Sequence, residues 1–198
     1  MKHYFFEVKI VIEADFVKVI EHSRGIEGEV ERSECLAYKI DDADGLSKHL
    51  GFANSLLSKV DYFCAKENTI QFIELTDLEN DICNIKCNIQ KKIEFEEQQK
   101  GNKLTTKEKG AIRKKAWSLV TNEIKRKWSG SIAIIERLYR KNKIYSDDPD
   151  YQMLIVCKNK TDIIMLDVLQ RRLQGMMGTI VFCKTRNISE YLISTISE

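Results

Sequence analysis

Two carboxylates stand at the ends of a predicted β-hairpin. Asp61 opens the apolar run Val60–Ala65, and Glu74 lies near the end of the run Thr69–Leu75. Because side chains alternate along a strand, Glu74 and Thr76 are expected on one face. Asp61 and Glu74 are therefore candidate ligands for a hard cation such as Mg²⁺, which prefers oxygen. A metal ion held in this way activates water and neutralises the charge that builds up on a phosphate.

The same residues resemble the PD-(D/E)XK nuclease superfamily, whose core has an acidic residue, a hairpin turn and an acid-x-Lys triplet on the next strand. Asp61 and the triplet Glu74-Leu75-Thr76 match the first two parts, and in outline the likeness spans roughly residues 27–185. The resemblance implies a restriction-endonuclease-like fold with Asp61 and Glu74 as catalytic and metal-binding residues. It also implies a third metal-binding carboxylate from an upstream segment, for which Glu27 and Glu29 are both candidates.

The triplet departs from the family at Thr76, which stands where the lysine is expected and has no positive charge. That residue can neither orient water nor stabilise a developing oxyanion, so the resemblance predicts an impaired catalytic centre. A lysine from elsewhere in the chain is the alternative, and the candidates are Lys59, Lys86, Lys91 and Lys92. A purely structural role also stays open, with Asp61 at a strand edge and Glu74 paired with a basic residue at the rim of the sheet.

Positive charge gathers in the segment 100–143, which has 14 Lys and Arg against 3 Asp and Glu. The remaining residues have 18 basic and 27 acidic side chains, so the two parts differ in the sign of their net charge. Basic side chains along helices can bind a nucleic-acid backbone by displacing its counterions. The candidate nucleic-acid-binding residues are Arg113, Lys114, Lys115, Lys125, Arg126, Lys127, Arg137, Arg140 and Lys141.

Other roles are compatible with this charge. The basic helices can be a solvated face, or they can dock onto an acidic partner protein or onto the acidic segment Glu94–Glu97 of the chain itself. Trp117 is expected in the core beside the apolar stripe, whereas Trp128 either stacks on a base or packs.

Together these features predict a nuclease-fold protein with an impaired catalytic centre. It would act as a nucleic-acid-associated or complex-assembling component, as part of a complex or homo-oligomer, and proteins resembling it occur in prokaryotic and phage defence. The first alternative is an active Mg²⁺-dependent nuclease that uses Asp61, Glu74 and a relocated lysine. The second is a protein-binding inhibitor or immunity module whose basic helices meet an acidic protein.

Helical patterns occupy the middle of the chain. Apolar residues at helical spacing predict a helix over Asp77–Gln99, which the Gly-Asn-Lys sequence at 101–103 ends. Thr105 and Glu108 have the spacing of a capping box, so a second helix is predicted to begin there. Ser129-Gly130 is expected to break or bend that helix before a further one from about Ser131 to Lys141.

Strand patterns lie on both sides of these helices. Residues 3–13 and about 30–40 are expected strands, followed by a helix over residues 46–60 that Asp44 caps. After the basic segment, the runs YQMLIVCK and GTIVFCK enclose a helical pattern, and this order favours a parallel pair of strands. Residues 189–198 are predicted to form a short helix.

The composition is that of one globular α/β domain over residues 1–198, with a central mixed sheet flanked by helices. Hydrophobic residues make up 43% of the chain, which argues against disorder. No apolar run is long enough for a membrane span and no export signal is visible, so we expect no membrane partner, a cytoplasmic location and reduced cysteines. Cys83 and Cys87 lack the spacing of a zinc knuckle, and one face of a helix is the simpler reading.

Overall fold

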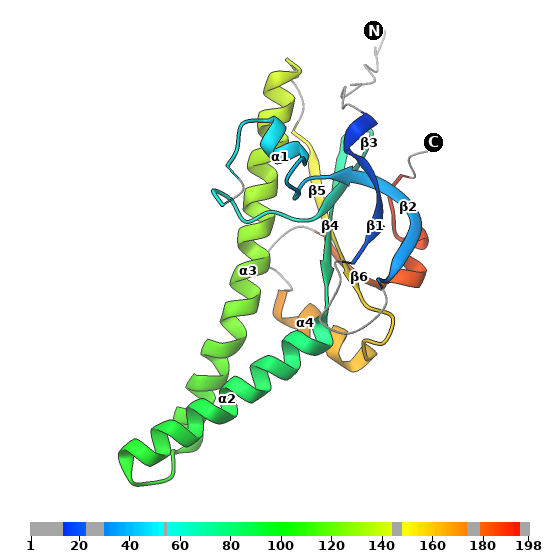
Figure 1. Cartoon of the computed structure of the whole chain (residues 1–198). Coiled ribbons are helices and arrows are strands. Elements are labelled where there is room, and N and C mark those ends of the chain that lie inside the picture. The colour runs from blue at the N-terminus through cyan, green and yellow to red at the C-terminus, as the bar shows by residue number, and fades with distance from the viewer. Residues whose placement is uncertain (1–13, 23–29, 54, 144–147, 174–178, 195–198) are drawn as a thin grey trace, which may run out of the picture.

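A six-stranded mixed sheet organises the chain, in the order β1-β2-β3-β4-β5-β6 (Figure 1). The computed structural model describes residues 14–22, 30–53, 55–143, 148–173 and 179–194. The α/β class with a mixed sheet is therefore confirmed. The strands are β1 (Val17–Glu21), β2 (Arg32–Lys39), β3 (Tyr62–Lys66), β4 (Thr69–Thr76), β5 (Asp150–Cys157) and β6 (Thr179–Lys184).

The sheet has an antiparallel half and a parallel half. Strands β1 to β4 pair antiparallel in chain order, and β3 and β4 form the predicted hairpin, with Tyr62 opposite Ile73. Its turn contains Glu67 with φ of 51°, a left-handed conformation that suits a two-residue hairpin connection. Strands β5 and β6 run parallel to β4, with α4 (Ile163–Leu173) between them, as the sequence order predicted.

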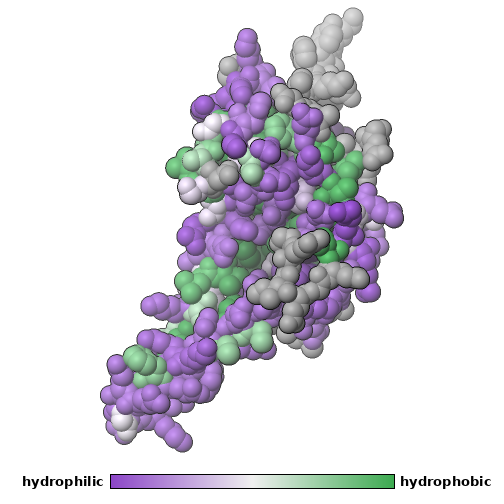
Figure 2. Space-filling view, in the orientation of Figure 1, coloured by the Kyte–Doolittle hydropathy of each residue, from purple (hydrophilic) through white to green (hydrophobic). Residues whose placement is uncertain are grey.

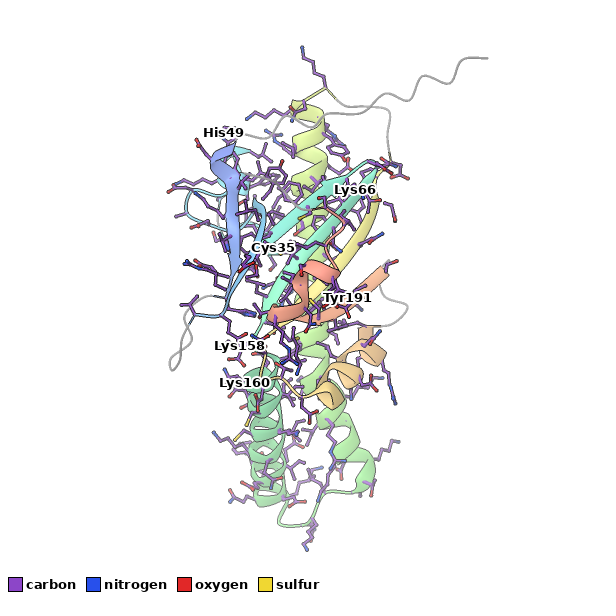
Figure 3. The ribbon with its side chains drawn as sticks, turned by 90° about the vertical axis from the view of Figure 1, so that its right-hand side faces the viewer. Cys35, His49, Lys66, Lys158, Lys160 and Tyr191 are labelled. Atoms are coloured by element: carbon purple, nitrogen blue, oxygen red, sulfur yellow. The ribbon has the colours of Figure 1, made fainter. Side chains whose placement is uncertain are left out.

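Side chains alternate between two apolar layers. Phe72 and Ile155 face the layer that contains α1 (Leu46–His49), α3 (Thr106–Lys141) and α4. Ile73 and Leu154 face the opposite layer, which the 3₁₀ helix η2 (Thr185–Glu190) and the residues after it cover. Figure 3 shows Tyr191 on this second face, where the Gln71 side chain donates a hydrogen bond to its carbonyl oxygen. Both faces of the sheet are therefore covered.

Helices α2 (Leu78–Lys100) and α3 form an antiparallel hairpin that projects beyond the sheet (Figure 1). The side chain of Asp77 caps α2, and Gly101 ends it with φ of 67°. The capping box predicted at the start of α3 is present, since Thr105 and Glu108 each accept a hydrogen bond from the other's backbone N–H. Much of the projecting surface is hydrophilic (Figure 2). This hairpin confirms both predicted helix starts.

The predicted break at Ser129-Gly130 is wrong, because α3 continues through both residues to Lys141. Gly130 is needed for a close approach instead. A Cβ atom there would lie 2.0 Å from the carbonyl oxygen of Ser58. The next residue, Ser131, accepts a hydrogen bond from the Val60 backbone N–H at 2.9 Å. A Gly-Ser pair that resembles a helix breaker therefore marks the place where the chain before β3 packs on α3.

The predicted helix over residues 46–60 is also wrong in most of its length. Helix α1 covers only Leu46–His49, and its N-cap is Gly45 rather than Asp44. Gly51 follows with φ of 87°, a left-handed conformation that stops a helix. The apolar residues at helical spacing beyond this point belong to an irregular connection that packs partly on the core.

The ends of the chain differ from the sequence prediction in detail. The predicted strand over residues 3–13 lies outside the described residues, and β1 was not predicted. The strand expected at about 30–40 is confirmed as β2. The predicted C-terminal helix is wrong for residues 191–194, because the helical turn η2 ends at Glu190 and lies earlier in the chain.

Two further expectations concern membranes and cysteines. Within the described part of the chain, every helix is too short or too polar to cross a membrane. The six cysteines are free thiols. Cys83 and Cys87 are both exposed and lie one turn apart on α2, as the helical reading predicted.

Candidate functional site

The hairpin brings Asp61 and Glu74 to the same end of the sheet. Tyr62 is opposite Ile73, so Asp61 and Glu74 are the next residues along the two strands. The Asp61 Oδ2 atom accepts a hydrogen bond from the Leu75 backbone N–H at 2.9 Å, which fixes its carboxylate against β4. Asp61 is also near enough to Glu74 to raise the pKa of that side chain. The two predicted carboxylates are therefore neighbours.

Glu74 lies on the α3 face of the sheet and is only 6% exposed. Its Oε1 atom accepts a hydrogen bond from the Lys127 Nζ atom of α3 at 2.5 Å. Its Oε2 atom is buried and has no hydrogen-bond partner in the described residues. A cavity of about 230 Å³ lies beside it, bounded by the end of β4, the start of α2 and the middle of α3.

Burial dominates the electrostatics of this pair. Burial raises the pKa of Glu74, and the negative charges of Asp61 and Glu123 raise it further, whereas Lys127 opposes the shift. Burial lowers the pKa of Lys127, but attraction to Glu74 and Asp61 outweighs that effect, so the net shift is upward. Each charge thus depends on the other inside a poorly solvated site.

Asp61 opens to a different cavity from Glu74. This polar cavity has a volume of about 760 Å³ and includes Asp61 but not Glu74 among its lining residues. The Lys39 Nζ atom lies 4.0 Å from the Asp61 Oδ1 atom. Lys158, which pairs with Asp77 at 2.6 Å, lies at the end of the sheet near α2 (Figure 3). Leu75 and Asp77 line both cavities, so the two carboxylates flank a shared wall.

Thr76, which replaces the lysine of the family pattern, makes a polar contact with another acid. Its Oγ1 atom donates a hydrogen bond to the Asp81 Oδ2 atom at 3.0 Å. Asp81 and Glu123 line the Glu74 cavity, and sequence reasoning did not identify either of them. Burial raises the pKa of Asp81, and Thr76 opposes that shift.

A third metal ligand is not in place among the residues that the structure describes. Within them, no group of three His, Cys, Asp or Glu side chains is arranged to hold a metal ion. Glu27 and Glu29, the upstream carboxylates suggested by the resemblance, lie outside the described residues. Asp61 and Glu74 are neighbours, but they line different cavities.

The lysine at Glu74 is none of the four candidates that the sequence offered. Lys59 pairs with Asp41 at 3.0 Å, and Lys92 pairs with Glu96 at 3.4 Å. Lys86 and Lys91 are exposed on α2.

Lys127, which the sequence assigned to nucleic-acid binding, is the lysine that reaches Glu74. It follows Val120 and Ile124 at helical spacing. Its position on the apolar stripe of α3 was therefore the sequence feature from which its contact with the core could have been predicted.

The other eight predicted nucleic-acid-binding residues are exposed along α3. Arg137 donates a hydrogen bond to the Leu50 carbonyl oxygen. The remaining seven form no ion pair with any residue in the described ranges. They are Arg113, Lys114, Lys115, Lys125, Arg126, Arg140 and Lys141.

The predicted alternative of docking onto Glu94–Glu97 involves a different basic residue. Within that acidic segment, Glu97 pairs with Lys109 at 2.9 Å and also accepts a hydrogen bond from the Leu104 backbone N–H. Lys109 holds α2 against α3 and is not one of the nine predicted residues. The seven exposed cations of α3 thus stay available to an anionic partner.

The two tryptophans pack within the protein. Trp128 meets Phe72 edge-on, with ring centroids 5.6 Å apart, and also contacts Tyr151. This answers the question left open by the sequence in favour of packing. Trp117 is partly buried against the core and lies under the Arg172 guanidinium group of α4.

Comparisons of the chain with protein-family models, with curated proteins and with solved structures gave no match.

Proposed function

We propose that this protein binds nucleic acid and hydrolyses phosphodiester bonds with Mg²⁺, using Asp61, Glu74 and Lys127. The observation that carries the proposal is Glu74 itself. It is a buried carboxylate, one oxygen of which has no hydrogen-bond partner in the described part of the chain. It lies next to Asp61 and contacts a lysine. A buried, strongly perturbed carboxylate beside a specific charge partner is a typical feature of functional sites.

The order of the elements supports a nuclease-like fold. One acid directly precedes β3, a tight turn follows that strand, and a second acid lies near the end of β4. The helical hairpin then leads to β5, which pairs parallel to β4. From the hairpin onward this is the order expected from the resemblance to the PD-(D/E)XK superfamily, whereas the helix expected before the hairpin covers only Leu46–His49. On the first ground we include a restriction-endonuclease-like fold in the proposal.

The two carboxylates fit Mg²⁺ better than a softer metal. Mg²⁺ keeps several water ligands and is often bound by only one or two carboxylates together with substrate phosphates. The Glu74 Oε2 atom has no hydrogen-bond partner among the residues described, and the Asp61 carboxylate is about a quarter exposed, with its Oδ1 atom 4.0 Å from Lys39. When bound, the metal supplies an activated water and neutralises charge on the phosphate.

Lys127 supplies what Thr76 cannot. Its ammonium group has three N–H donors, and one of them is used on Glu74. The remaining donors can hold a phosphate oxygen or a water molecule, and the raised pKa of Lys127 keeps the group charged at neutral pH. Asp61 is held in place by the Leu75 backbone N–H, so its carboxylate is positioned before any substrate arrives.

The test is cleavage of labelled single-stranded and duplex DNA and RNA with Mg²⁺ or with EDTA. We expect Mg²⁺-dependent cleavage that is lost in Asp61→Asn, Glu74→Gln and Lys127→Met. Lys91→Met is the control, because that lysine is exposed on α2 and far along the hairpin from the site. Circular dichroism confirms that each variant is folded, and the partly exposed Asp61 offers the variant least dependent on packing. Equal activity in wild type and in Asp61→Asn would refute the proposal.

One observation favours a second function, nucleic-acid binding without hydrolysis. The Glu74–Lys127 pair already neutralises the buried carboxylate, and the raised pKa of Glu74 disfavours the ionised form that binds metal. In that case the wild type binds oligonucleotides but cleaves none with Mg²⁺ or Mn²⁺. Calorimetric titration with Mg²⁺ then shows no heat of binding in either the wild type or Glu74→Gln.

A further inference from the structure

A groove of about 500 Å³ lies between α3 and the connection that precedes β3. It is separate from the cavities beside Asp61 and Glu74. Its lining residues come from one short stretch of the connection and one turn of α3. They are Ser55, Leu56, Leu57, Ser58, Lys125, Arg126, Ser129 and Gly130.

Close packing builds the groove. Gly130 lets the Ser58 carbonyl oxygen approach α3, at a place where any Cβ atom would lie 2.0 Å from that oxygen. Just beyond the groove, the Val60 backbone N–H donates a hydrogen bond to the Ser131 Oγ atom. These two contacts hold the wall of the groove against the helix, so the site does not depend on a ligand for its shape.

The charge of the groove is entirely positive. Lys125 and Arg126 are exposed and form no ion pair with a described residue, and none of the lining residues is acidic. The cavities beside Asp61 and Glu74 differ, because each contains several carboxylates. An anion entering the groove therefore meets two uncompensated cations and no opposing charge.

The hydroxyl groups identify the kind of anion. Ser55, Ser58 and Ser129 are exposed around the two cations, and each hydroxyl can donate one hydrogen bond. A phosphate has several acceptor oxygens, and serine, lysine, arginine and backbone groups are the usual partners of nucleic-acid phosphates. A backbone phosphate and a carboxylate each have two charged oxygens, so the choice of phosphate rests on this set of partner side chains.

We infer that this groove binds a backbone phosphate of the nucleic acid, through Lys125, Arg126 and the surrounding serines. The inference rests on the proposed function, because it takes nucleic acid as the partner. Lys125 and Arg126 directly precede Lys127 in α3. A nucleic-acid strand bound in the groove therefore lies along the turn of α3 that contacts Glu74 on its other side.

The test measures binding without catalysis. Fluorescence anisotropy follows labelled single-stranded and duplex oligonucleotides in EDTA over a series of salt concentrations. The double variant Lys125→Gln/Arg126→Gln should lose about tenfold in affinity, and the slope of log K against log salt should become less steep by about one, as expected for the loss of one phosphate contact. Ser58→Ala/Ser129→Ala should weaken binding without changing the slope, because it removes no charge.

The matched control is Lys114→Gln/Lys115→Gln, which removes the same charge from an exposed part of α3 outside the groove. Its affinity should fall by less than about threefold. Equal losses of affinity in Lys125→Gln/Arg126→Gln and in Lys114→Gln/Lys115→Gln would overturn the inference, because they would indicate binding to a diffuse basic face. Failure of the wild type to bind either oligonucleotide at low salt would overturn it too, and would favour an acidic protein partner.

The binding result and the cleavage result are independent. If the wild type cleaves nucleic acid but the groove variants bind it normally, the groove inference is wrong and the proposed hydrolysis stands. If the groove variants lose binding but the wild type never cleaves, the proposed hydrolysis is wrong and the groove inference is supported.

Discussion

Replacing Lys127 with methionine tests the electrostatics of the candidate site most directly. The side chain of Glu74 is 7% exposed and that of Lys127 is 24% exposed, so the ion pair is largely shielded from water. Removal of one partner of a buried pair leaves an uncompensated charge, which is costly. The folded variant can avoid that cost by taking up a proton on Glu74.

Protonation of Glu74 limits how much stability the Lys127→Met variant can lose, and this upper limit is called the ceiling below. The ordinary pKa of a glutamate in the unfolded chain is 4.5. Each pH unit above that value costs about 1.36 kcal/mol to keep the group protonated, so the ceiling is about 3.4 kcal/mol at pH 7. In the intact pair the pKa of Glu74 is raised to about 8, so the wild type also loses stability as pH rises toward that value. Glu74 of Lys127→Met stays protonated to higher pH, so only the variant should go on losing stability above pH 8.

Urea denaturation in EDTA at pH 7 and pH 9 measures the effect. We expect the penalty of Lys127→Met to be up to about 1.4 kcal/mol larger at pH 9 than at pH 7, because Glu74 of the wild type loses its proton near pH 8 whereas Glu74 of the variant keeps it. In a Glu74→Gln background the same change should cost little and show no pH dependence, since Asp61 and Glu123 are present in both backgrounds. An equal penalty at both pH values, or a pH dependence that survives Glu74→Gln, would refute the reasoning.

Two predictions concern α3 itself. Gly130→Ala should destabilise the protein by more than about 2 kcal/mol, because its Cβ atom would collide with the Ser58 backbone. Gly110→Ala in the same helix meets no atom within 4 Å and should instead stabilise it by about 0.5–1 kcal/mol, so a loss in both would contradict the steric argument. Thr105→Ala removes the capping side chain and should cost about 1 kcal/mol in urea denaturation. Thr105→Ser keeps the hydroxyl, and an equal cost in that variant would exclude the cap as the cause.

Local signals predicted much of the fold. The Thr105 and Glu108 pair located the start of α3, and the β-branched and aromatic residues of Thr69–Leu75 located β4. The strand–helix–strand order near the C-terminus located the parallel pair. These features depend on residues close in sequence, where backbone geometry and the spacing of apolar residues determine the structure. The proximity of Asp61 to Glu74 followed from the same hairpin.

The sequence predictions fail where contacts between segments far apart in the chain determine the structure. Gly130 looks like a helix breaker in sequence, but its role comes from Ser58, which lies 72 positions earlier. Lys127 looks like one more cation in a basic helix, yet it is 53 residues from Glu74 and contacts it directly. Spacing along one helix cannot reveal which carboxylate a lysine meets, because that depends on how the helix crosses the sheet.

The crossing of α3 over the sheet explains why one helix serves two roles. Consecutive residues of a helix point about 100° apart, so Lys125 and Lys127 differ by about 200° and lie on nearly opposite sides of α3. Lys127 is directed to Glu74 at the end of β4, whereas Lys125 and Arg126 face the groove lined by Ser55 and Ser58. A change in the position of α3 would therefore move both sets of cations together. Nucleic acid bound by the outer pair would therefore lie on the same turn of α3 as the lysine that contacts Glu74.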